Sequence, residues 1–262
     1  VEKYHLNLSQ DGTFNPRDIF GSHDDSDHVY NTPRAWYMAR CLNPSTMNWD
    51  GPDADFTPLS DDIPWCMVPE KKVTIEDVKY VLSSHFQGTP YDPYASYGDK
   101  SMKGAYRAIG VNRTDFLGII QMRPDAEEDS RAIEWVAFAS NVFNTAAPFY
   151  TDVEKVPEYF ANTTGDASTD NFYWASRMIA AMADASYSKS IFHIERYQER
   201  VMSKGHEYIN QYDELLAKES NAAKRMQLRQ EANQKIADMV KKETQDTLNK
   251  VLYELSNQMK NA

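Results

Sequence analysis

The stretch FLGIIQMRPDAEEDSRAIEWVAFASNVFNTAAPFYTDV, residues 116–153, decides the fold class that the sequence predicts. Its short runs of β-branched and aromatic residues are separated by the polar segment 123–130, RPDAEEDS, which is typical of a hairpin loop. The runs alternate only loosely between apolar and polar residues, as in a sheet covered on at least one face. With the run that precedes this stretch, the sequence predicts an antiparallel meander with strands at Ala105–Asn112, Phe116–Met122, Ile133–Ser140 and Ala146–Val153.

A long helical region is predicted at the C-terminal end. Apolar side chains recur at steps of three and four in residues 188–262, for example at Leu248, Leu252 and Leu255. The polar segment Lys218–Asn221 interrupts this pattern. We therefore expect two long antiparallel helices that turn there and pack on the rest of the protein.

Three shorter helices have start signals, because polar side chains before them can cap the first free N–H groups. A capping box opens the first helix, and a Thr-Pro pair opens the second. The first helix begins with the capping box Thr74 and Asp77 and runs through Leu82. The second is capped by Thr32 before Pro33 and runs through Leu42. The third covers residues 171–187, with Ser168, Thr169 or Asp170 as its cap.

These elements predict an α+β protein with two parts. All 12 prolines lie at or before Pro157, and nine of the 10 glycines lie at or before Gly165. We expect a loop-rich body at residues 1–187 and a helical hairpin at residues 188–262. Residues 43–69 hold five prolines, and we expect them to form an irregular loop over the body.

Composition excludes several classes of function. The chain has 262 residues and a net charge of −11, which argues against a nucleic-acid partner because such a partner needs a basic surface. No apolar run approaches the roughly 18 residues of a membrane-spanning helix, so no membrane partner is expected. The only two cysteines, Cys41 and Cys66, cannot form a disulfide framework or a four-thiolate zinc site. Such low cysteine usage suits a reducing compartment, and we expect a cytoplasmic location.

Two groups of residues have the chemistry of metal binding or nucleophilic catalysis. The run His23–His28, HDDSDH, lacks the spacing of a calcium-binding loop, and a solvated loop explains it equally well, so we predict no metal site. Cys66 with His85 offers a thiol and a base, but no helix start follows Cys66 to activate it. Buried, inert thiols are the commoner case, and this applies to Cys41 too.

Polar residues at one helix start and two strand ends are candidates for a pocket. Arg34 lies in a first helical turn, where a cation opposes the helix dipole by about 0.3–1 kcal/mol. Its guanidinium could reach a carboxylate or a developing oxyanion there. Asn112 and Arg113 end one predicted strand, and Asn141 and Asn144 end another. Turn chemistry explains asparagines at strand ends, but two polar clusters in one sheet can also converge on a pocket.

Five segments in fixed order resemble the bacterial dipeptidase A family of cysteine peptidases, which is related to penicillin V acylase and conjugated bile acid hydrolase. The resemblance covers residues 1–187 closely and the helical tail by position. The segments are YNTPRAWY at 30–37, HFQGTPYDPY at 85–94, IGVNRT at 109–114, ASNVFNT at 139–145 and STDNFYWA at 168–175.

The resemblance implies an N-terminal-nucleophile hydrolase, in which two antiparallel sheets are stacked between layers of helices. It implies a Cys nucleophile as the first residue of the mature enzyme. The base is the α-amino group of that Cys, whose reference pKa of about 7.7–8.0 lies near working pH. Thiolate attack on an amide then gives a thioester, which water hydrolyses. Residue 1 is Val1, so the resemblance implies a nucleophile upstream of it. This chain is then the C-terminal half of a dipeptidase and is inactive alone.

The resemblance also implies site residues and partners. In the acylase branch an Arg in the first turn of a helix lies beside the nucleophile, which makes Arg34 the catalytic candidate and Arg40 its rival. No cofactor and no metal are expected. The expected partners are a dipeptide substrate, the upstream segment and, through the hairpin, a second copy of the chain. The residues expected to line the substrate pocket are Asn112, Arg113, Asn141 and Asn144.

Two other functions fit the sequence. An acylase that acts on another amide would use the same machinery. A non-catalytic interaction module would instead use the apolar stripe of the hairpin at residues 188–262 to bind another chain.

Overall fold

The structure, a computed structural model, describes residues 1–7, 14, 16–22 and 24–261. The chain divides into an N-terminal unit, Val1–Ile109, and a C-terminal unit, Gly110–Ala262, and each is described here by itself. The fold is α+β, as predicted, with one three-stranded antiparallel sheet among the described residues. The boundary between the units lies after Ile109, so the helical hairpin and the sheet belong to the same unit. The expected domain division after residue 187 stays a prediction.

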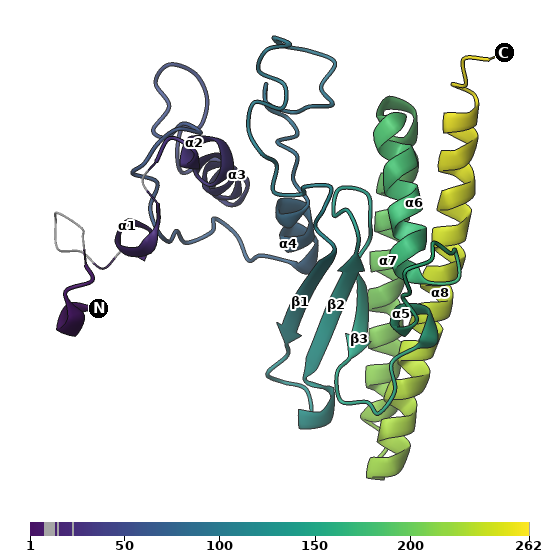
Figure 1. Ribbon diagram of the computed structural model, residues 1–262. Helices are drawn as coiled ribbons and strands as arrows, with labels where there is room; N and C mark the ends of the chain where they lie inside the picture. The colour runs from purple at the N-terminus through teal and green to yellow at the C-terminus, as the bar shows by residue number, and fades with distance from the viewer. Residues whose placement is uncertain (8–13, 15, 23, 262) are drawn as a thin grey trace. The chain divides into compact units, whose positions relative to one another are not determined.

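The sheet of the C-terminal unit confirms three of the four predicted strands. Strands β1 (Phe116–Met122), β2 (Ala132–Phe138) and β3 (Ala147–Tyr150) follow one another in space, each antiparallel to the next (Figure 1). Ile119 lies opposite Trp135, which in turn lies opposite Pro148. The side chain of Trp135 is only 1% exposed, so this face of the sheet is the core of the unit.

The fourth predicted strand, Ala105–Asn112, is wrong. The segment is irregular: the N–H of Arg107 donates to the carbonyl of Val29, far away in the sequence, and a turn follows in which the N–H of Thr114 donates to the carbonyl of Val111. Tyr106, like Ala108 and Ile109, packs against an aromatic cluster of the N-terminal unit. Apolar side chains at these positions therefore serve packing within a loop and not a sheet ladder.

Helices cover the core face of the sheet. They are α6 (Phe172–Ala185), α7 (Tyr187–Leu216) and α8 (Ala222–Ser256), of which α7 and α8 form the predicted antiparallel hairpin (Figure 1). The short helix α5 (Glu158–Ala161) packs on α6 and α8, and its Phe160 contacts Phe138 and Phe149 of the strands. The side-chain amide of Asn233 in α8 pairs with the backbone N–H and C=O of Tyr150 at 2.9 and 3.0 Å. Gly205 lets α7 approach β3, because a Cβ there would lie 2.6 Å from Cδ of Pro148.

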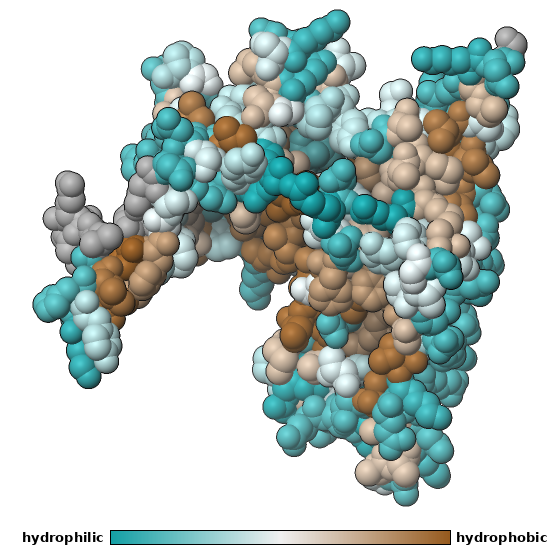
Figure 2. Space-filling model, in the orientation of Figure 1, coloured by the Kyte–Doolittle hydropathy of each residue, from teal (hydrophilic) through white to brown (hydrophobic). Residues whose placement is uncertain are grey.

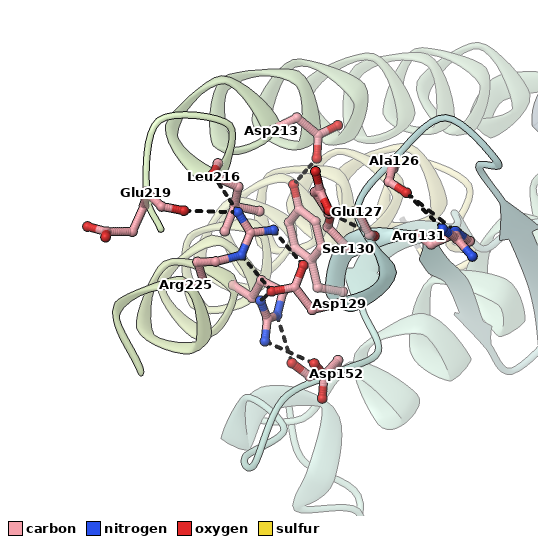
Figure 3. Close-up of polar contacts among 12 residues, drawn as sticks. Ala126, Glu127, Asp129, Ser130, Arg131, Asp152, Asp213, Leu216, Glu219 and Arg225 are labelled. Carbon is pink, nitrogen blue, oxygen red and sulfur yellow. Dashed lines mark hydrogen bonds and ion pairs between the residues drawn. The ribbon is translucent and has the colours of Figure 1, made fainter. Parts of the chain in front are cut away.

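A cluster of ion pairs ties the hairpin to the loop between β1 and β2 (Figure 3). The carboxylate of Asp129 accepts hydrogen bonds from both Arg225 and Arg229 of α8. Arg229 is 2% exposed and also donates to Asp152 after β3, at 3.0 Å. The cluster therefore joins the polar loop 123–131, the end of β3 and α8.

The other face of the sheet is open and apolar. Phe116, Ile120 and Met122 of β1 are 54%, 68% and 61% exposed. Beside them a cavity of about 240 Å³ lies between the strands and α5, with Phe138 and Phe149 among its walls. Figure 2 shows hydrophobic side chains gathered over the strands on this side. A contiguous apolar surface of this kind is typical of a surface that another element covers.

The N-terminal unit has short helices around an aromatic core. The elements are η1 (Glu2–Tyr4), α1 (Pro16–Phe20), α2 (Asp27–Tyr30), α3 (Thr32–Leu42) and α4 (Ile75–Leu82). The buried core consists of Trp36, Tyr37, Trp49, Ile63 and Phe86. Residues 43–69 are without helix or strand, as predicted, and contribute Trp49 and Ile63 to this core.

The predicted caps are partly correct. Thr74 and Asp77 form the capping box of α4, as predicted. Thr32 is not a cap but the first residue of α3, because α3 follows α2 directly and the Asn31 carbonyl accepts from the N–H of Arg34. The cap of α6 is Asn171, whose side chain accepts from the N–H of Trp174 at 2.9 Å, and not one of the three preceding residues.

Across the described ranges, no helix has both the length and the apolar character needed to cross a bilayer.

Candidate active site

Arg34 lies at the third position of α3, in its first turn, as predicted. Its Nε donates to the backbone carbonyl of Arg107 at 3.1 Å, which fixes the guanidinium although the side chain is only partly buried. Partial burial, and after it the positive charge of Arg107, lower the pKa of Arg34 from its ordinary value. The site therefore carries two neighbouring positive charges.

Arg107 is held by a cation–π contact and by its backbone. Its guanidinium lies over the ring of Tyr30, 4.7 Å from the centroid, and its backbone N–H donates to the carbonyl of Val29 at 3.0 Å. A stacked guanidinium keeps the N–H groups along its edge available for hydrogen bonds. Arg107 is not among the predicted site residues, although it lies two residues before the segment IGVNRT.

Arg40, the rival of Arg34, lies in the last turn of α3. It pairs with Asp50 at 3.0 Å and lies 5.8 Å from the ring centroid of Trp36. Its charge is therefore already neutralised, in contrast to the charge of Arg34.

Asn112 and Arg113 lie in an exposed turn before β1, not at a strand end. The backbone carbonyl of Asn112 accepts a hydrogen bond from Arg177 of α6. This contact fixes the turn on the C-terminal unit and leaves the side chains of both residues in solvent.

Asn141 and Asn144 lie together in the buried loop between β2 and β3. The amide nitrogen of Asn144 donates to the carbonyls of Phe138 and Ala139 and to Oδ1 of Asn141, at 2.6, 3.2 and 3.3 Å. Ala139 has a φ of 64°, which is unusual for a residue with a side chain. Asn144 therefore stabilises a strained loop.

The same loop contains side-chain oxygens without hydrogen-bond partners. These buried atoms are Oγ of Ser140, Oδ1 of Asn144 and Oγ1 of Thr145, with no partner in the described parts of the chain. Folded proteins rarely leave such atoms unpaired, so this loop has unused capacity to bind a hydrogen-bond donor.

Of the two cysteines, only Cys41 agrees with the expected buried thiol. Cys41 is half-buried, and this burial raises the pKa of its thiol. Cys66 is exposed. The imidazole of His85 lies 2.9 Å from the carboxylate of Asp92, and both side chains are buried.

No described residues form a group of three or more side chains suited to hold a metal ion. His23, the first residue of the candidate run, lies outside the described residues. Asp24, Asp27 and His28 instead line a cavity of about 460 Å³ beside the start of α3. Asp24 bonds to Ser26 within this acidic segment.

The predicted site residues thus fall into two groups. Arg34 belongs to the N-terminal unit, whereas the four predicted pocket residues, Asn112, Arg113, Asn141 and Asn144, belong to the C-terminal unit. Of these four, only the two loop asparagines are joined by a hydrogen bond among the described contacts.

This chain belongs to peptidase family C69, because the family model matches residues 1–200. It is 46% identical to a dipeptidase of Bifidobacterium longum over 100% of this chain and 56% of that protein. It is 45% identical to a probable dipeptidase A of Streptococcus pyogenes, over 100% of this chain and 53% of the relative. With dipeptidase A of Lactobacillus helveticus the identity is 32%, over 97% of this chain and 51% of the relative.

These matches confirm the predicted relationship to the dipeptidase A family. The chain spans about half the length of the curated relatives it matches.

Proposed function

We propose that the full-length protein is a cytoplasmic cysteine dipeptidase and that this chain forms its C-terminal half. The observation that carries the proposal is the identity of 45–46% to dipeptidases over the whole chain. The peptide carbonyl of a dipeptide is attacked by a thiolate that an upstream segment supplies. The amine product leaves with a proton, and water then hydrolyses the thioester.

The open sheet face supports an upstream segment as the partner of this chain. Exposed Phe116, Ile120 and Met122 offer an apolar surface to which a second sheet would pack, as the four-layer sandwich of N-terminal-nucleophile hydrolases requires. Burial of apolar surface contributes about 25 cal/mol per Å², so covering this face stabilises the whole protein.

Four residues of the C-terminal unit are proposed to line the substrate pocket. The unpartnered oxygens beside Asn141 and Asn144 support this role for the β2–β3 loop, because a bound substrate has N–H groups to donate. Asn112 and Arg113 are proposed on the resemblance alone, and their exposure is compatible with contact to a ligand.

Arg34 is the residue of this chain that we assign to the catalytic site. The backbone carbonyl of Arg107 positions its partly buried guanidinium. There its positive charge would stabilise the carboxylate of the substrate or the oxyanion that forms during the reaction. Arg34→Ala in the full-length protein is expected to lower kcat/KM for a dipeptide by at least about tenfold. Unchanged kinetics would remove Arg34 from the site.

The test of the function compares three proteins with a dipeptide panel. The full-length protein is expected to release free amino acids, whereas residues 1–262 alone and a full-length variant without the upstream nucleophile are not. Amino-acid release by residues 1–262 alone would show that the nucleophile lies within this chain. Hydrolysis of acylated amides but not of dipeptides would make the protein an acylase of the same superfamily.

The hairpin is the proposed contact between two copies of the chain. Phe192, Leu252 and Tyr253 are exposed on α7 and α8. Removal of residues 188–262 separates this role from catalysis. Loss of assembly with retained activity would favour an interaction role for the hairpin.

A further inference from the structure

Two arginines from distant parts of the sequence lie together in the N-terminal unit. Arg34 donates its Nε to the carbonyl of Arg107, and the guanidinium of Arg107 lies over the ring of Tyr30. The backbone of Arg107 is in turn held by Val29, one residue before Tyr30. Both guanidiniums are therefore placed by contacts with uncharged groups, an aromatic ring and a backbone carbonyl.

Neither guanidinium has an acidic partner within the described parts of the chain. The structure pairs Arg40 with Asp50, Arg123 with Asp213, and Arg225 and Arg229 with Asp129, but it gives Arg34 and Arg107 no carboxylate within 4.0 Å. Two acidic side chains of the same unit bond elsewhere: Asp27 to Ser22 and Asn31, and Asp61 to His28.

Such an arrangement is unfavourable for a chain by itself. Two like charges repel each other, and the lowered pKa of Arg34 reflects both burial and this repulsion. Arg34 also lies in the first turn of α3, at the positive end of the helix dipole. All three effects are relieved by one bound anion, and perturbed charges of this kind are concentrated at functional sites.

We propose that Arg34 and Arg107 together bind the free C-terminal carboxylate of the substrate. This inference rests on the proposed dipeptidase function and identifies the part of the substrate that the pair recognises. Recognition of this carboxylate makes the enzyme select short peptides with a free acid end beside the scissile bond.

The contacts of the pair suit a carboxylate. The terminal nitrogens of Arg34 have no hydrogen-bond partner among the described residues, and the edge of the stacked Arg107 has none either. Planar guanidinium edges match the two oxygens of a carboxylate and can hold it with parallel hydrogen bonds. A lysine at either position keeps the charge but loses this geometry.

The test compares a dipeptide with its C-terminal amide in the full-length protein. For the wild type, kcat/KM for L-Ala-L-Ala is expected to exceed that for L-Ala-L-Ala amide by at least about tenfold. Arg34→Gln and Arg107→Gln remove this preference, mainly through a higher KM for the free acid. Arg107→Lys retains part of it.

Arg196→Gln is the matched control, because it removes the same charge from an exposed side chain of α7 that pairs with Glu199. It is expected to leave the preference unchanged. Circular dichroism checks that each variant is folded. Equal losses for acid and amide in the two arginine variants would overturn the proposal and indicate that the pair binds an acidic side chain of the protein itself or the reacting oxyanion.

A binding measurement separates this inference from the proposed function. The probe is Ala-Ala with a reduced, non-hydrolysable peptide bond, as the free acid and as the amide, measured by calorimetry. Tighter binding of the acid that depends on both arginines supports the carboxylate site even if no dipeptide is hydrolysed. Equal binding of acid and amide by the wild type overturns the site even if dipeptides are hydrolysed.

Discussion

Asp129→Asn in the full-length protein is expected to lower the free energy of unfolding by about 2–3 kcal/mol. The carboxylate of Asp129 accepts from Nε and a terminal nitrogen of Arg225, at 2.7 and 2.5 Å, and from a terminal nitrogen of Arg229. Hydrogen bonds to charged groups contribute about 1.5–3 kcal/mol each, but an asparagine oxygen still accepts, and the carboxylate is 27% exposed and therefore screened. The net loss is thus close to that of one such bond.

Urea unfolding followed by tryptophan fluorescence measures the effect. The hydrogen bond from Arg225, with the charges of both arginines, lowers the pKa of Asp129 from its ordinary value. The difference between wild type and variant is therefore complete above about pH 4 and shrinks as the pH falls towards the lower folded pKa. Asp246→Asn, which removes exposed ion pairs with Lys250 and Arg200, is the control and costs less than about 0.5 kcal/mol. An equal cost for the two variants, or a difference independent of pH, would refute the reasoning.

Three further variants test buried contacts, two within the C-terminal unit and one within the N-terminal unit. Gly205→Ala places a Cβ 2.6 Å from Pro148 and is expected to cost about 1–3 kcal/mol, seen as a lower Tm; an unchanged Tm would show that α7 and β3 are not this close. Asn144→Ala leaves the carbonyls of Phe138 and Ala139 without their donor, and faster amide hydrogen exchange in residues 139–146 is expected, with a loss of about 1–3 kcal/mol. Burial lowers the pKa of Lys79 to about 7, so stability rises with pH between about 7 and the unfolded value near 10.4. Lys79→Met is expected to remove this rise, and its persistence in the variant would assign it to another group.

Local patterns predicted the elements whose stability depends on local contacts. The hairpin helices follow from apolar periodicity, and the α4 capping box lies within four residues. The false strand at 105–112 has the composition of a strand, but Tyr106 packs on Tyr91 and Phe86, which the sequence cannot place. Prediction therefore failed where distant residues decide the outcome.

In the candidate site too, features set by local sequence were predicted and features set by distant residues were not. The first-turn position of Arg34 follows from a Thr-Pro helix start and was predictable from its own segment. Arg107 was missed because its partners, Arg34 and the Tyr30 ring, lie more than 70 residues away along the chain. Asn144 was predicted from its segment, but the hydrogen bonds that stabilise the loop became visible only in the structure.

The arginine pair is a cluster of like charges, whereas the open sheet face is an exposed apolar surface. Added salt weakens contacts of the first kind but not of the second, so a salt titration can distinguish their roles. Salt screens charge over about 8–10 Å at 0.10–0.15 M and more tightly at higher concentration, so sodium chloride is expected to raise KM for a free dipeptide while leaving its amide almost unaffected. Apolar contacts at Phe116, Ile120 and Met122 carry no charge and are not screened. If the upstream segment stays packed on this chain at high salt while the enzyme loses its preference for free acids, both features have the proposed roles. Loss of assembly together with the preference would instead indicate that the pair contributes to contacts within the protein.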